Sequence, residues 1–470
     1  MQGERVKRWR GSAARPSRQA ASGGAACALL VMAWLAGAAT AQAAAASGPF
    51  PRPPALEPNV AFWRDVFARY SRNHTIIHDN EHLDRVYAVL DFRAWAGENG
   101  RLDAKHERMR RDREKAARRH YADLLKRLHA KRGRVGDLTA EERRVYALFT
   151  NDSSKSRFRS AAERVRAQSG LRERFREGIA RMKGYEPAMV EIFRQKGLPP
   201  ELTRMALVES TFDLDAYSRV GAAGVWQFMP RTGRQYLRID SAVDERRDPL
   251  RATWAAAEHL RRDREALGAW PLAITAYNHG RGGIARGVRT VGSDDIGVIA
   301  RRYKGTNFGF ASRNFYAEFL AALDVTANES KYFGGPIAAV PAPRSREVRL
   351  QKPMRLHHAA RHVGVDSETL IAMNPAFLSR VIGGRSSIPR GYRLRVPATG
   401  DDGRLALSQA NARRVASGKP LYRLHEVRRG QTLGAIARRY GTTAGTLQRL
   451  NGIRRPRSLQ VGRVLKVPAG

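Results

Sequence analysis

The sequence predicts a mainly α-helical protein that ends in small α+β modules. Three observations carry this prediction. Apolar residues recur at helical spacing between Phe62 and Met182, a helix start at 199–201 opens an amphipathic run to Ser210, and residues 422–468 follow the order strand, helix, helix, strand. With 470 residues the chain is too long for one ordinary domain, so roughly two to four modules are expected.

The N-terminal 43 residues have the pattern of a secretory signal peptide. Basic residues between Arg5 and Arg18 precede an apolar run at 25–35, and small residues then dominate through Ala43. This predicts export across the inner membrane to the periplasm or cell envelope. An uncleaved anchor is the alternative, although a span needs about 20 apolar residues, so we expect no transmembrane span in the mature chain. Removal of Cys27, the single cysteine, would leave no thiol chemistry.

A linker and a helical arm are expected next. Residues 44–58 are rich in Ala and Pro, which indicates a linker, and residues 59–184 are charged and periodic, which indicates a helical N-terminal region without detectable chemistry. His74, His78 and His82 recur at every fourth position, and on a helix they would share one face. No carboxylate-rich pattern accompanies them, so no metal site is expected.

Glu209 is the strongest candidate for a chemical role. A helix start at Pro200 and Glu201 places Leu202, Met205, Ala206 and Glu209 on one helical face. A carboxylate therefore stands where the pattern calls for an apolar residue. Burial raises the pKa of a carboxyl group, as a general acid requires near neutrality. The alternative is a Glu at the edge of the apolar stripe, paired with one of the many arginines.

Three short motifs follow one another in order: Glu209-Ser210, the segment 224–227 (Gly-Val-Trp-Gln) and the segment 276–278 (Ala-Tyr-Asn). Together they resemble the signature of family 1 murein lytic transglycosylases, which have the soluble-lytic-transglycosylase fold and are related to goose-type lysozyme. Longer strings at 206–212, 244–249 and 314–316 resemble the membrane-bound lytic transglycosylase D subgroup. The resemblance implies a lysozyme-like, mainly α catalytic domain over residues 185–333.

The resemblance also implies substrate-binding residues around Glu209, namely Ser210, Ser218, Gly224, Gln227, Tyr277, Asn278 and Tyr316. The residues alone leave other roles open. Gly224 suits an ordinary turn as well as a loop that approaches a ligand closely, and Trp226 suits the core as well as stacking on a sugar. Tyr277 is either a half-buried core residue or a hydroxyl that reaches Glu209 or the substrate.

The C-terminal part contains an internal repeat. A linker at 334–346 precedes a degenerate copy at 347–397, and a second linker at 398–421 precedes the complete copy at 422–468. The complete copy resembles a lysin motif, a βααβ module that binds chains containing N-acetylglucosamine. By this resemblance the sugar groove comprises Gly430, Gln431, Thr432, Leu433, Asn451, Gly452 and Ile453. Gly430, Thr432 and Asn451 also suit turn and cap positions.

The charge is extreme, with 85 basic against 44 acidic residues and a net charge of +41. Such a balance favours polyanionic surroundings. No zinc-finger spacing, RNP-like aromatic signature or basic zipper is present, which argues against a specific nucleic-acid partner. Peptidoglycan glycan strands are the expected partner, with anionic envelope polymers as a further candidate.

Most glycosidases need two carboxyl groups, and the sequence marks only one. Asp213 and Asp215 lie close to Glu209, but they suit a helix-ending turn equally well. The resemblance implies that Glu209 works alone, cleaves the bond between N-acetylmuramic acid and N-acetylglucosamine, and leaves a 1,6-anhydro end without cofactor or metal. The alternatives are a hydrolytic muramidase with a second acid and a non-catalytic peptidoglycan-binding scaffold.

Overall fold

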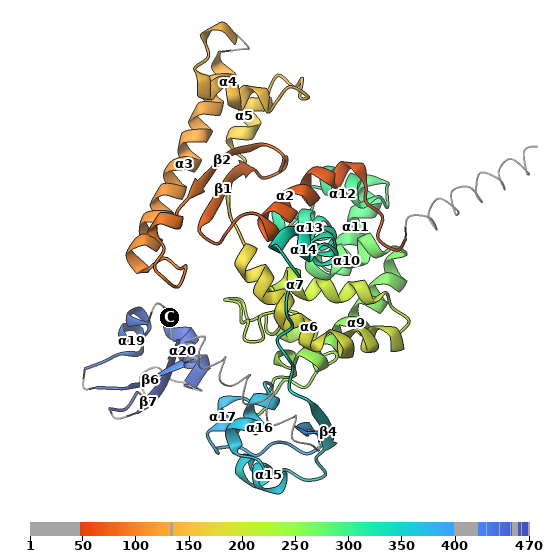
Figure 1. Ribbon diagram of the computed structural model, residues 1–470, viewed down its shortest axis with the longest axis vertical. Coiled ribbons are helices and arrows are strands. Elements are labelled where there is room, and N and C mark those ends of the chain that lie inside the picture. Colours follow the sequence, from red (N-terminus) through yellow and green to blue (C-terminus); the bar gives the residue numbers. More distant parts are fainter. Residues whose placement is uncertain are drawn as a thin grey trace, which may run out of the picture. The chain divides into compact units, whose positions relative to one another are not determined.

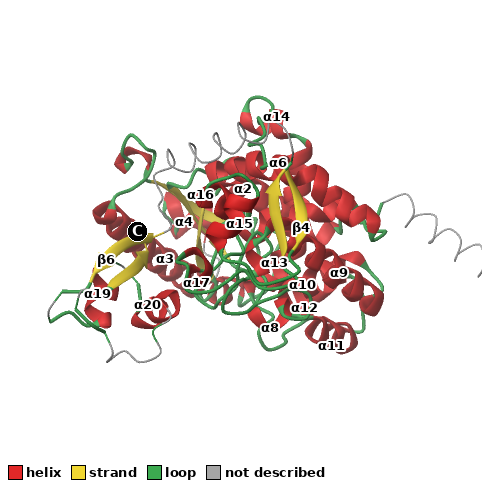
Figure 2. Cartoon of the chain, turned by 90° about the horizontal axis from the view of Figure 1, so that it is seen from below, coloured by secondary structure: helices red, strands yellow, loops and turns green. Residues whose placement is uncertain are grey.

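The computed structural model describes residues 48–131, 135–398 and 422–468, the last range with gaps at 429, 441, 452, 454–458 and 462. The expected signal peptide, nearly all of the linker at 398–421, and Gly452 therefore lie outside the described residues. Within the described ranges, every helix is too short or too polar to cross a membrane. Helices, drawn in red in Figure 2, dominate the chain, so the mainly α prediction is confirmed.

The N-terminal region contains a sheet where helices were expected. Strands β1 (His74–Asp79), β2 (Val86–Asp91) and β3 (Val165–Ser169) form an antiparallel sheet in the order β2-β1-β3. The predicted helical region therefore contains helices as expected but also a sheet that was not predicted. Thr75, Ile76 and Ile77 are β-branched and fully buried, and such residues pack well on a pleated surface. Because β1 is a strand that ends at Asp79, the three histidines do not share a helical face.

Both faces of β1 are buried. Its sequence therefore lacks the alternation of apolar and polar residues that marks a strand with one face in water. Ile77 packs into a core formed with the helices α3 (Ala104–Ala130), α4 (Ala140–Ala147) and α5 (Arg157–Ala162). On the other face, the His78 ring lies 4.6 Å from the ring of Phe62 in helix α2 (Glu57–Ala68). Figure 1 shows α3 running beside β1 and β2.

Helix α2 belongs to the main helical bundle and not to a linker or an arm. It packs along α13 (Phe310–Ala327), and Asn59 Nδ2 donates a 2.8 Å hydrogen bond to Asn314 Oδ1. Val60, Trp63 and Phe67 of α2 are buried, because an apolar helix face packs against another element and not against water. Helix α6 (Arg172–Gln195) likewise crosses the expected domain boundary at 184/185. The bundle thus includes α2 and the first part of α6, which the sequence pattern assigned to the linker and to the helical N-terminal region.

The bundle is completed by a series of short and long helices between residues 200 and 333 (Figure 1). They are η4 (Pro200–Arg204), α7 (Met205–Ser210), α8 (Pro230–Gly233), η5 (Glu245–Arg247), α9 (Pro249–Leu267), α10 (Trp270–His279), α11 (Arg281–Val291), α12 (Ile296–Arg302) and α14 (Glu329–Phe333). The short single-turn elements η1 (Pro54–Leu56), η2 (Arg93–Trp95) and η3 (Val135–Asp137) lie in the N-terminal region.

Two C-terminal segments share one local architecture. The first has β4 (Ser345–Arg349), α15 (Leu356–His362), α16 (Ser367–Met373), α17 (Ser379–Ile382) and β5 (Arg393–Pro397); the second has β6 (Tyr422–Glu426), α19 (Leu433–Arg439), α20 (Ala444–Asn451) and β7 (Val464–Pro468). Asn374 and Asn451 each donate to the carbonyl four residues earlier and to a carbonyl of the last strand, at 2.8–2.9 Å. This shared amide clasp supports an internal repeat.

The segment 345–397 is joined to the bundle through a buried ion pair. Arg395 on β5 contacts Asp248 through two hydrogen bonds of 2.9 Å, and the two side chains are only 9% and 3% exposed. Val243 from the bundle packs into the same apolar core as Phe377. Asp248 also caps α9 by accepting from the backbone of Leu250 and Arg251. The segment therefore shares a core with the bundle.

We expect Arg395→Met to lower the free energy of unfolding by about 3–5 kcal/mol, because it leaves the Asp248 carboxylate buried without its partner. Chemical denaturation measures this effect. Arg393→Met is the matched control on the same strand, since Arg393 is 54% exposed and should change stability by at most about 0.5 kcal/mol. Adding Asp248→Asn to Arg395→Met should recover part of the loss, because Asn still caps α9. Equal effects of Arg395→Met and Arg393→Met would contradict the assignment.

Candidate active site

Glu209 lies on the last turn of α7, at the end of an otherwise apolar face. Leu202, Met205 and Ala206 are fully buried, and Glu209 is half-buried in line with them. The predicted single helix is divided, because Leu202 lies in the 3-10 element η4 and α7 begins at Met205, but the three apolar residues are buried as expected. Figure 1 shows α7 beside α6 and α13 within the bundle. These packed neighbours hold the carboxyl group in a largely apolar setting.

The Glu209 carboxyl group has no stabilising partner in the part of the chain that the structure describes. It forms no hydrogen bond or ion pair with any described residue, and burial raises its pKa to about 8. A carboxyl group with this pKa keeps its proton at neutral pH, which is the state that a general acid needs. The alternative prediction of a Glu paired with an arginine does not match the described structure.

A strained turn directly follows Glu209-Ser210. Thr211 and Phe212 have φ values of 52° and 49°, in the left-handed region that favours glycine. Arg181 of α6 holds this turn, since it donates from Nε to the Phe212 carbonyl and from Nη2 to the Thr211 carbonyl, both at 2.9 Å. Strain of this kind costs about 1–3 kcal/mol per residue and persists only where the surroundings enforce it. Sequence reasoning missed Arg181, which fixes where α7 ends.

The loop 216–230 lies against the end of α7. Ser210 Oγ donates a 3.0 Å hydrogen bond to the Val225 carbonyl and so ties the helix to the loop. Gly224 has a φ of 74°, and a Cβ there would lie 1.9 Å from the carbonyl oxygen of Arg246. Only glycine fits that position. Gln227 donates from Nε2 to the Gly224 carbonyl at 2.8 Å, so its amide shapes the loop.

Arg246 also holds the loop 216–230, and sequence reasoning did not identify it as a site residue. Its Nη1 donates to the carbonyls of Gly221 and Phe228 at 2.7 and 2.8 Å, and its Nη2 pairs with Asp244 at 2.6 Å. The signal for Arg246 in the sequence was the string 244–249, which contributed to the family resemblance but indicated no role for this residue. Both side chains are buried, so this ion pair is part of the frame of the site.

Tyr277 of helix α10 holds the loop 216–230 near Glu209. Its hydroxyl donates a 2.9 Å hydrogen bond to the Trp226 carbonyl, and the nearby Glu209 charge adds to burial in raising the pKa of Tyr277 well above its ordinary value. Trp226 is fully buried, and its Nε1 donates to Thr253 Oγ1 at 2.9 Å. Trp226 is therefore a core residue and does not offer its ring to a sugar.

The remaining predicted site residues have mainly structural contacts. Ser218 Oγ accepts from the Ala222 backbone at 2.8 Å and closes the turn that begins the loop. Asn278 is exposed, and its Oδ1 accepts from Ser312 Oγ at 2.8 Å. Tyr316 is buried and stacks against Phe319. The contacts thus gather Ser210, Gly224, Gln227 and Tyr277 into one network beside Glu209.

A second carboxyl group, Glu318 on α13, lies near Glu209 and was not predicted. Burial and the Glu209 charge raise its pKa, and the cation of Arg166 opposes that rise. The same signal that marked Glu209 was available, because Glu318 also interrupts an apolar helical run, at 315–322. Asp213, proposed as a second acid, is exposed, and its Oδ1 accepts from the Asp215 backbone in a turn.

The predicted sugar-binding residues of the C-terminal segment also carry structural roles. Thr432 caps α19 by accepting from the Ala435 backbone at 3.2 Å, and Gly430 has a φ of 83° in the preceding turn. Gln431 hydrogen-bonds to His425 at 2.8 Å. Asn451 forms the amide clasp described above, and Leu433 and Ile453 are buried in the module core. These contacts shape the loops that the resemblance assigns to sugar binding.

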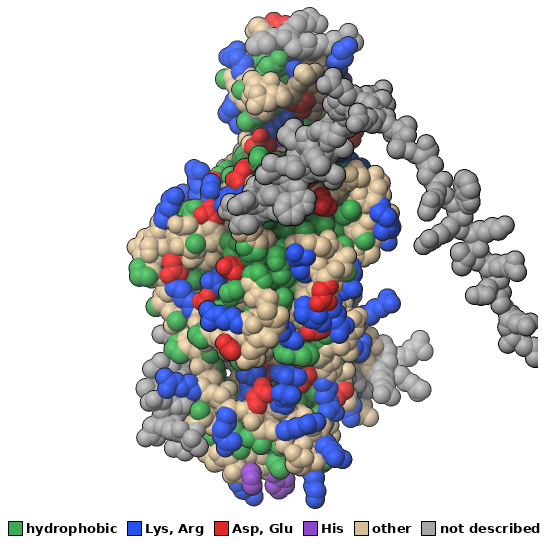
Figure 3. Space-filling view, turned by 90° about the vertical axis from the view of Figure 1, so that its right-hand side faces the viewer, with side chains coloured by type: hydrophobic (Ala, Val, Ile, Leu, Met, Phe, Trp, Pro, Cys, Tyr) green, Lys and Arg blue, Asp and Glu red, His purple; other side chains and the backbone are tan. Residues whose placement is uncertain are grey.

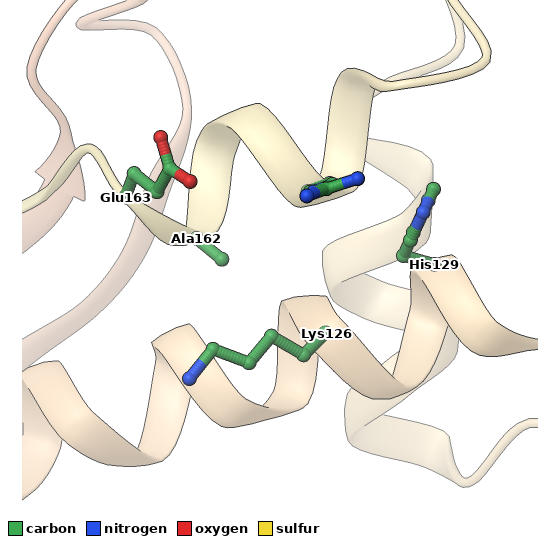
Figure 4. A pocket seen from close by; sticks show the side chains of 5 residues that line it. Lys126, His129, Ala162 and Glu163 are labelled. Carbon is green, nitrogen blue, oxygen red and sulfur yellow. The ribbon is translucent and has the colours of Figure 1, made fainter.

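Other surface features lie away from Glu209. A pocket of ≈ 270 Å³ lies between α3 and α5 and is lined by Lys126, His129, Arg159, Ala162 and Glu163 (Figure 4). Figure 3 shows that Lys and Arg are interspersed with Asp and Glu on the face in view. The described part of the chain contains no cluster of three His, Cys, Asp or Glu side chains arranged to hold a metal.

Two known domain families match the chain at these positions. The Transglycosylase SLT domain matches residues 191–299, a range that contains Glu209, the loop and Tyr277. The LysM domain matches residues 425–468. The chain therefore contains a transglycosylase SLT domain and a C-terminal LysM domain, as the resemblance predicted.

Comparison with individual proteins gives more specific matches than the two domain families do. The chain is 29% identical over 290 residues to the membrane-bound lytic murein transglycosylase D of Escherichia coli (strain K12), a match that covers 59% of this chain and 62% of that protein. It thus spans less than two thirds of that relative. A putative tributyltin chloride resistance protein of Alteromonas sp. (strain M-1) is 34% identical over 118 residues, which cover 24% of this chain and 55% of that protein.

A solved structure of the lytic transglycosylase Slt from Pseudomonas aeruginosa, an inactive mutant, also matches. The match has 17% identity and a TM-score of 0.27, and it covers 46% of this chain and 38% of that one.

Gly224→Ala should lower the melting temperature more than Gly268→Ala does. Both glycines have positive φ, but a Cβ at Gly268 meets nothing within 4 Å, whereas one at Gly224 collides with the Arg246 backbone. Gly268→Ala therefore measures the conformational cost alone, about 1 kcal/mol, and the excess at Gly224 measures the close approach of the loop. Thermal unfolding of both variants checks this. Similar shifts in melting temperature would show that the loop is not held against Arg246.

Proposed function

We propose that the protein is a lytic transglycosylase that cleaves the β-1,4 bond between N-acetylmuramic acid and N-acetylglucosamine in peptidoglycan, with Glu209 as its single general acid and base. The observation that carries the proposal is the half-buried, unpartnered carboxyl group with a pKa of about 8. The SLT domain match and the relative named as a lytic murein transglycosylase support the choice of substrate.

In the first step, the protonated Glu209 carboxyl donates its proton to the glycosidic oxygen as the bond from that oxygen to muramic C1 breaks. The apolar setting of α7 favours this step, since it makes the neutral form of Glu209 the stable one. In the second step, the muramic C6 hydroxyl oxygen bonds to C1 and its proton returns to Glu209. The carboxyl group ends as it began, and no water is consumed.

The loop 216–230 and Tyr277 hold the site in shape for these steps. Ser210 and Tyr277 each donate to a loop carbonyl, at Val225 and Trp226 respectively, so two elements that flank Glu209 are fixed to the same stretch of backbone. Positioning of this kind keeps the acid within reach of the bond that breaks. Their roles toward substrate are therefore positioning roles through the loop.

The LysM domain supplies attachment to the same polymer. A sugar-binding module on the chain of the enzyme raises the local concentration of glycan strands around the catalytic domain. The net charge of +41 adds attraction to anionic envelope polymers. Export to the periplasm or cell envelope would bring the protein to this substrate, in keeping with the relative described as membrane-bound.

A hydrolytic muramidase is the second candidate, and one observation favours it. Glu318 is a second carboxyl group near Glu209, and hydrolytic glycosidases use such a pair. A non-catalytic scaffold is disfavoured, because a buried carboxyl group without a partner is costly to keep for structure alone.

Glu209→Gln should leave the fold intact and reduce cleavage of purified peptidoglycan by at least about a thousandfold, because an amide can neither donate nor accept the transferred proton. Release of soluble muropeptides measures the activity, and thermal unfolding checks the fold. Asp213→Asn is the matched control on the exposed turn and should keep activity. A folded Glu209→Gln protein with near-normal turnover would remove Glu209 from the mechanism.

A further inference from the structure

The segment 345–397 and the complete copy at 422–468 correspond position by position over their first strand and two helices. β6, α19 and α20 begin at residues 422, 433 and 444, and β4, α15 and α16 begin 77 positions earlier, at 345, 356 and 367. The clasp residues Asn451 and Asn374 keep the same interval. The loop 451–453, which the resemblance assigns to sugar binding, therefore corresponds to residues 374–376.

In the first copy, the bundle covers this loop. Two backbone hydrogen bonds, of 2.8 and 2.9 Å, join the amide of Asp244 to the carbonyl of Ala376 and the amide of Leu378 to the carbonyl of Ala242. Ala376 and Phe377 are fully buried. The loop that binds sugar in the complete copy by resemblance is thus occupied here by contacts with the bundle.

The residues that pair with this loop also hold the loop 216–230. The Asp244 carboxylate accepts from Nε and Nη2 of Arg246 at 2.9 and 2.6 Å, and both side chains are buried. Arg246 Nη1 in turn donates to the carbonyls of Gly221 and Phe228. A first route of direct contacts therefore leads from the segment 345–397 to the loop beside Glu209.

A second route passes through the start of α9. Arg395 donates two hydrogen bonds of 2.9 Å to Asp248, whose carboxylate caps this helix. Thr253, in the first turns of α9, accepts a 2.9 Å hydrogen bond from Nε1 of Trp226. The Trp226 carbonyl accepts from the hydroxyl of Tyr277. The second route thus reaches the same loop at a different residue.

Both routes end beside a strained residue. Gln227 has a φ of 47°, in the left-handed region that favours glycine. Arg246 holds the carbonyl of Phe228 directly after it, and Thr253 holds the ring of Trp226 directly before it. Strain of this kind persists only where the surroundings enforce it. The contacts that enforce it are the ones that the segment 345–397 supports from behind.

We propose that the segment 345–397 is a brace for the active site, with Arg395 as its positioning residue. The brace holds residues 242–248, and these residues hold the loop 216–230 in place beside Glu209. It contributes to cleavage through the loop and not through contact with the glycan, so the catalytic unit extends past residue 333 to residue 397. This inference rests on the proposed function, in which Glu209 is the acid that the loop frames.

The first test is steady-state cleavage of soluble peptidoglycan fragments by the full chain carrying Arg395→Met/Asp248→Asn. This double variant cuts the second route without leaving either charge buried alone, and Asn still caps α9. We expect kcat per folded protein, measured well below the melting temperature, to fall by about tenfold, because misplacement of groups around the acid raises the barrier. KM should change by less than about twofold, and Arg393→Met on the same strand should leave both constants unchanged.

The second test is hydrogen exchange of the free protein, which needs no turnover. The amides of Gly221, Gly224 and Gln227 donate within the loop, and in the double variant they should exchange at least about tenfold faster than in wild type or in Arg393→Met. Faster exchange at these amides together with a lower kcat supports the brace.

Three results would overturn the inference. Unchanged exchange in the loop would mean that the segment does not hold it, whatever happens to activity. Faster exchange with an unchanged kcat would mean that the placement of the loop does not limit cleavage. A higher KM with an unchanged kcat would assign the segment to glycan binding. If exchange rises as expected but the wild-type protein cleaves no peptidoglycan, the proposed function fails on its own.

Discussion

The burial of one carboxyl group without a partner is the constraint on which the rest of the site depends. Raising the pKa of Glu209 from 4.5 to about 8 costs about 3 kcal/mol of folding free energy at pH 7, since each pKa unit corresponds to about 1.4 kcal/mol. The cost is absent below pH 4.5, grows as pH rises toward 8, and is constant above it. Apolar packing around α7 offsets this cost.

Two arginines, the partly exposed Arg181 and the buried Arg246, hold the backbone around that carboxyl group. Arg181 satisfies the carbonyls of the left-handed turn after α7, and Arg246 satisfies two carbonyls of the loop 216–230. Each converts a conformation that is unfavourable by itself into a fixed part of the site. The excess of basic residues therefore has a specific use within the bundle, in addition to any attraction toward anionic polymers.

The catalytic bundle is also assembled from distant parts of the sequence. Helix α2 packs on α13, the N-terminal sheet places Arg166 over the Phe310 ring at the start of α13, and Arg395 of the segment 345–397 reaches Asp248 at the start of α9. The domain boundaries predicted from composition would separate the residues that form these contacts. The bundle, the sheet and the first strand-helix-helix-strand segment are therefore better treated together than as a chain of independent modules.

These distant contacts also explain what the sequence could and could not predict. The helical face that ends in Glu209 follows from local periodicity, and the Thr432 cap follows from local propensity, so both were predicted. Strand β1 was missed because both its faces are buried by segments that neighbour it only in the fold. Glu318 interrupts an apolar run as Glu209 does, so its signal was available, but it lies outside the motifs that drew attention to Glu209. Arg181 left no local signal at all.

Mass analysis of the muropeptides released from purified peptidoglycan tests the central claim most directly. If Glu209 alone moves the proton and the C6 hydroxyl of the substrate attacks, each product should carry a 1,6-anhydro end and be lighter by one water than the hydrolysis product, without a new reducing end. Products that chiefly carry reducing ends would contradict the account, because water would then be the attacking group. Glu318, as the second carboxyl group beside Glu209, would be the residue that activates that water.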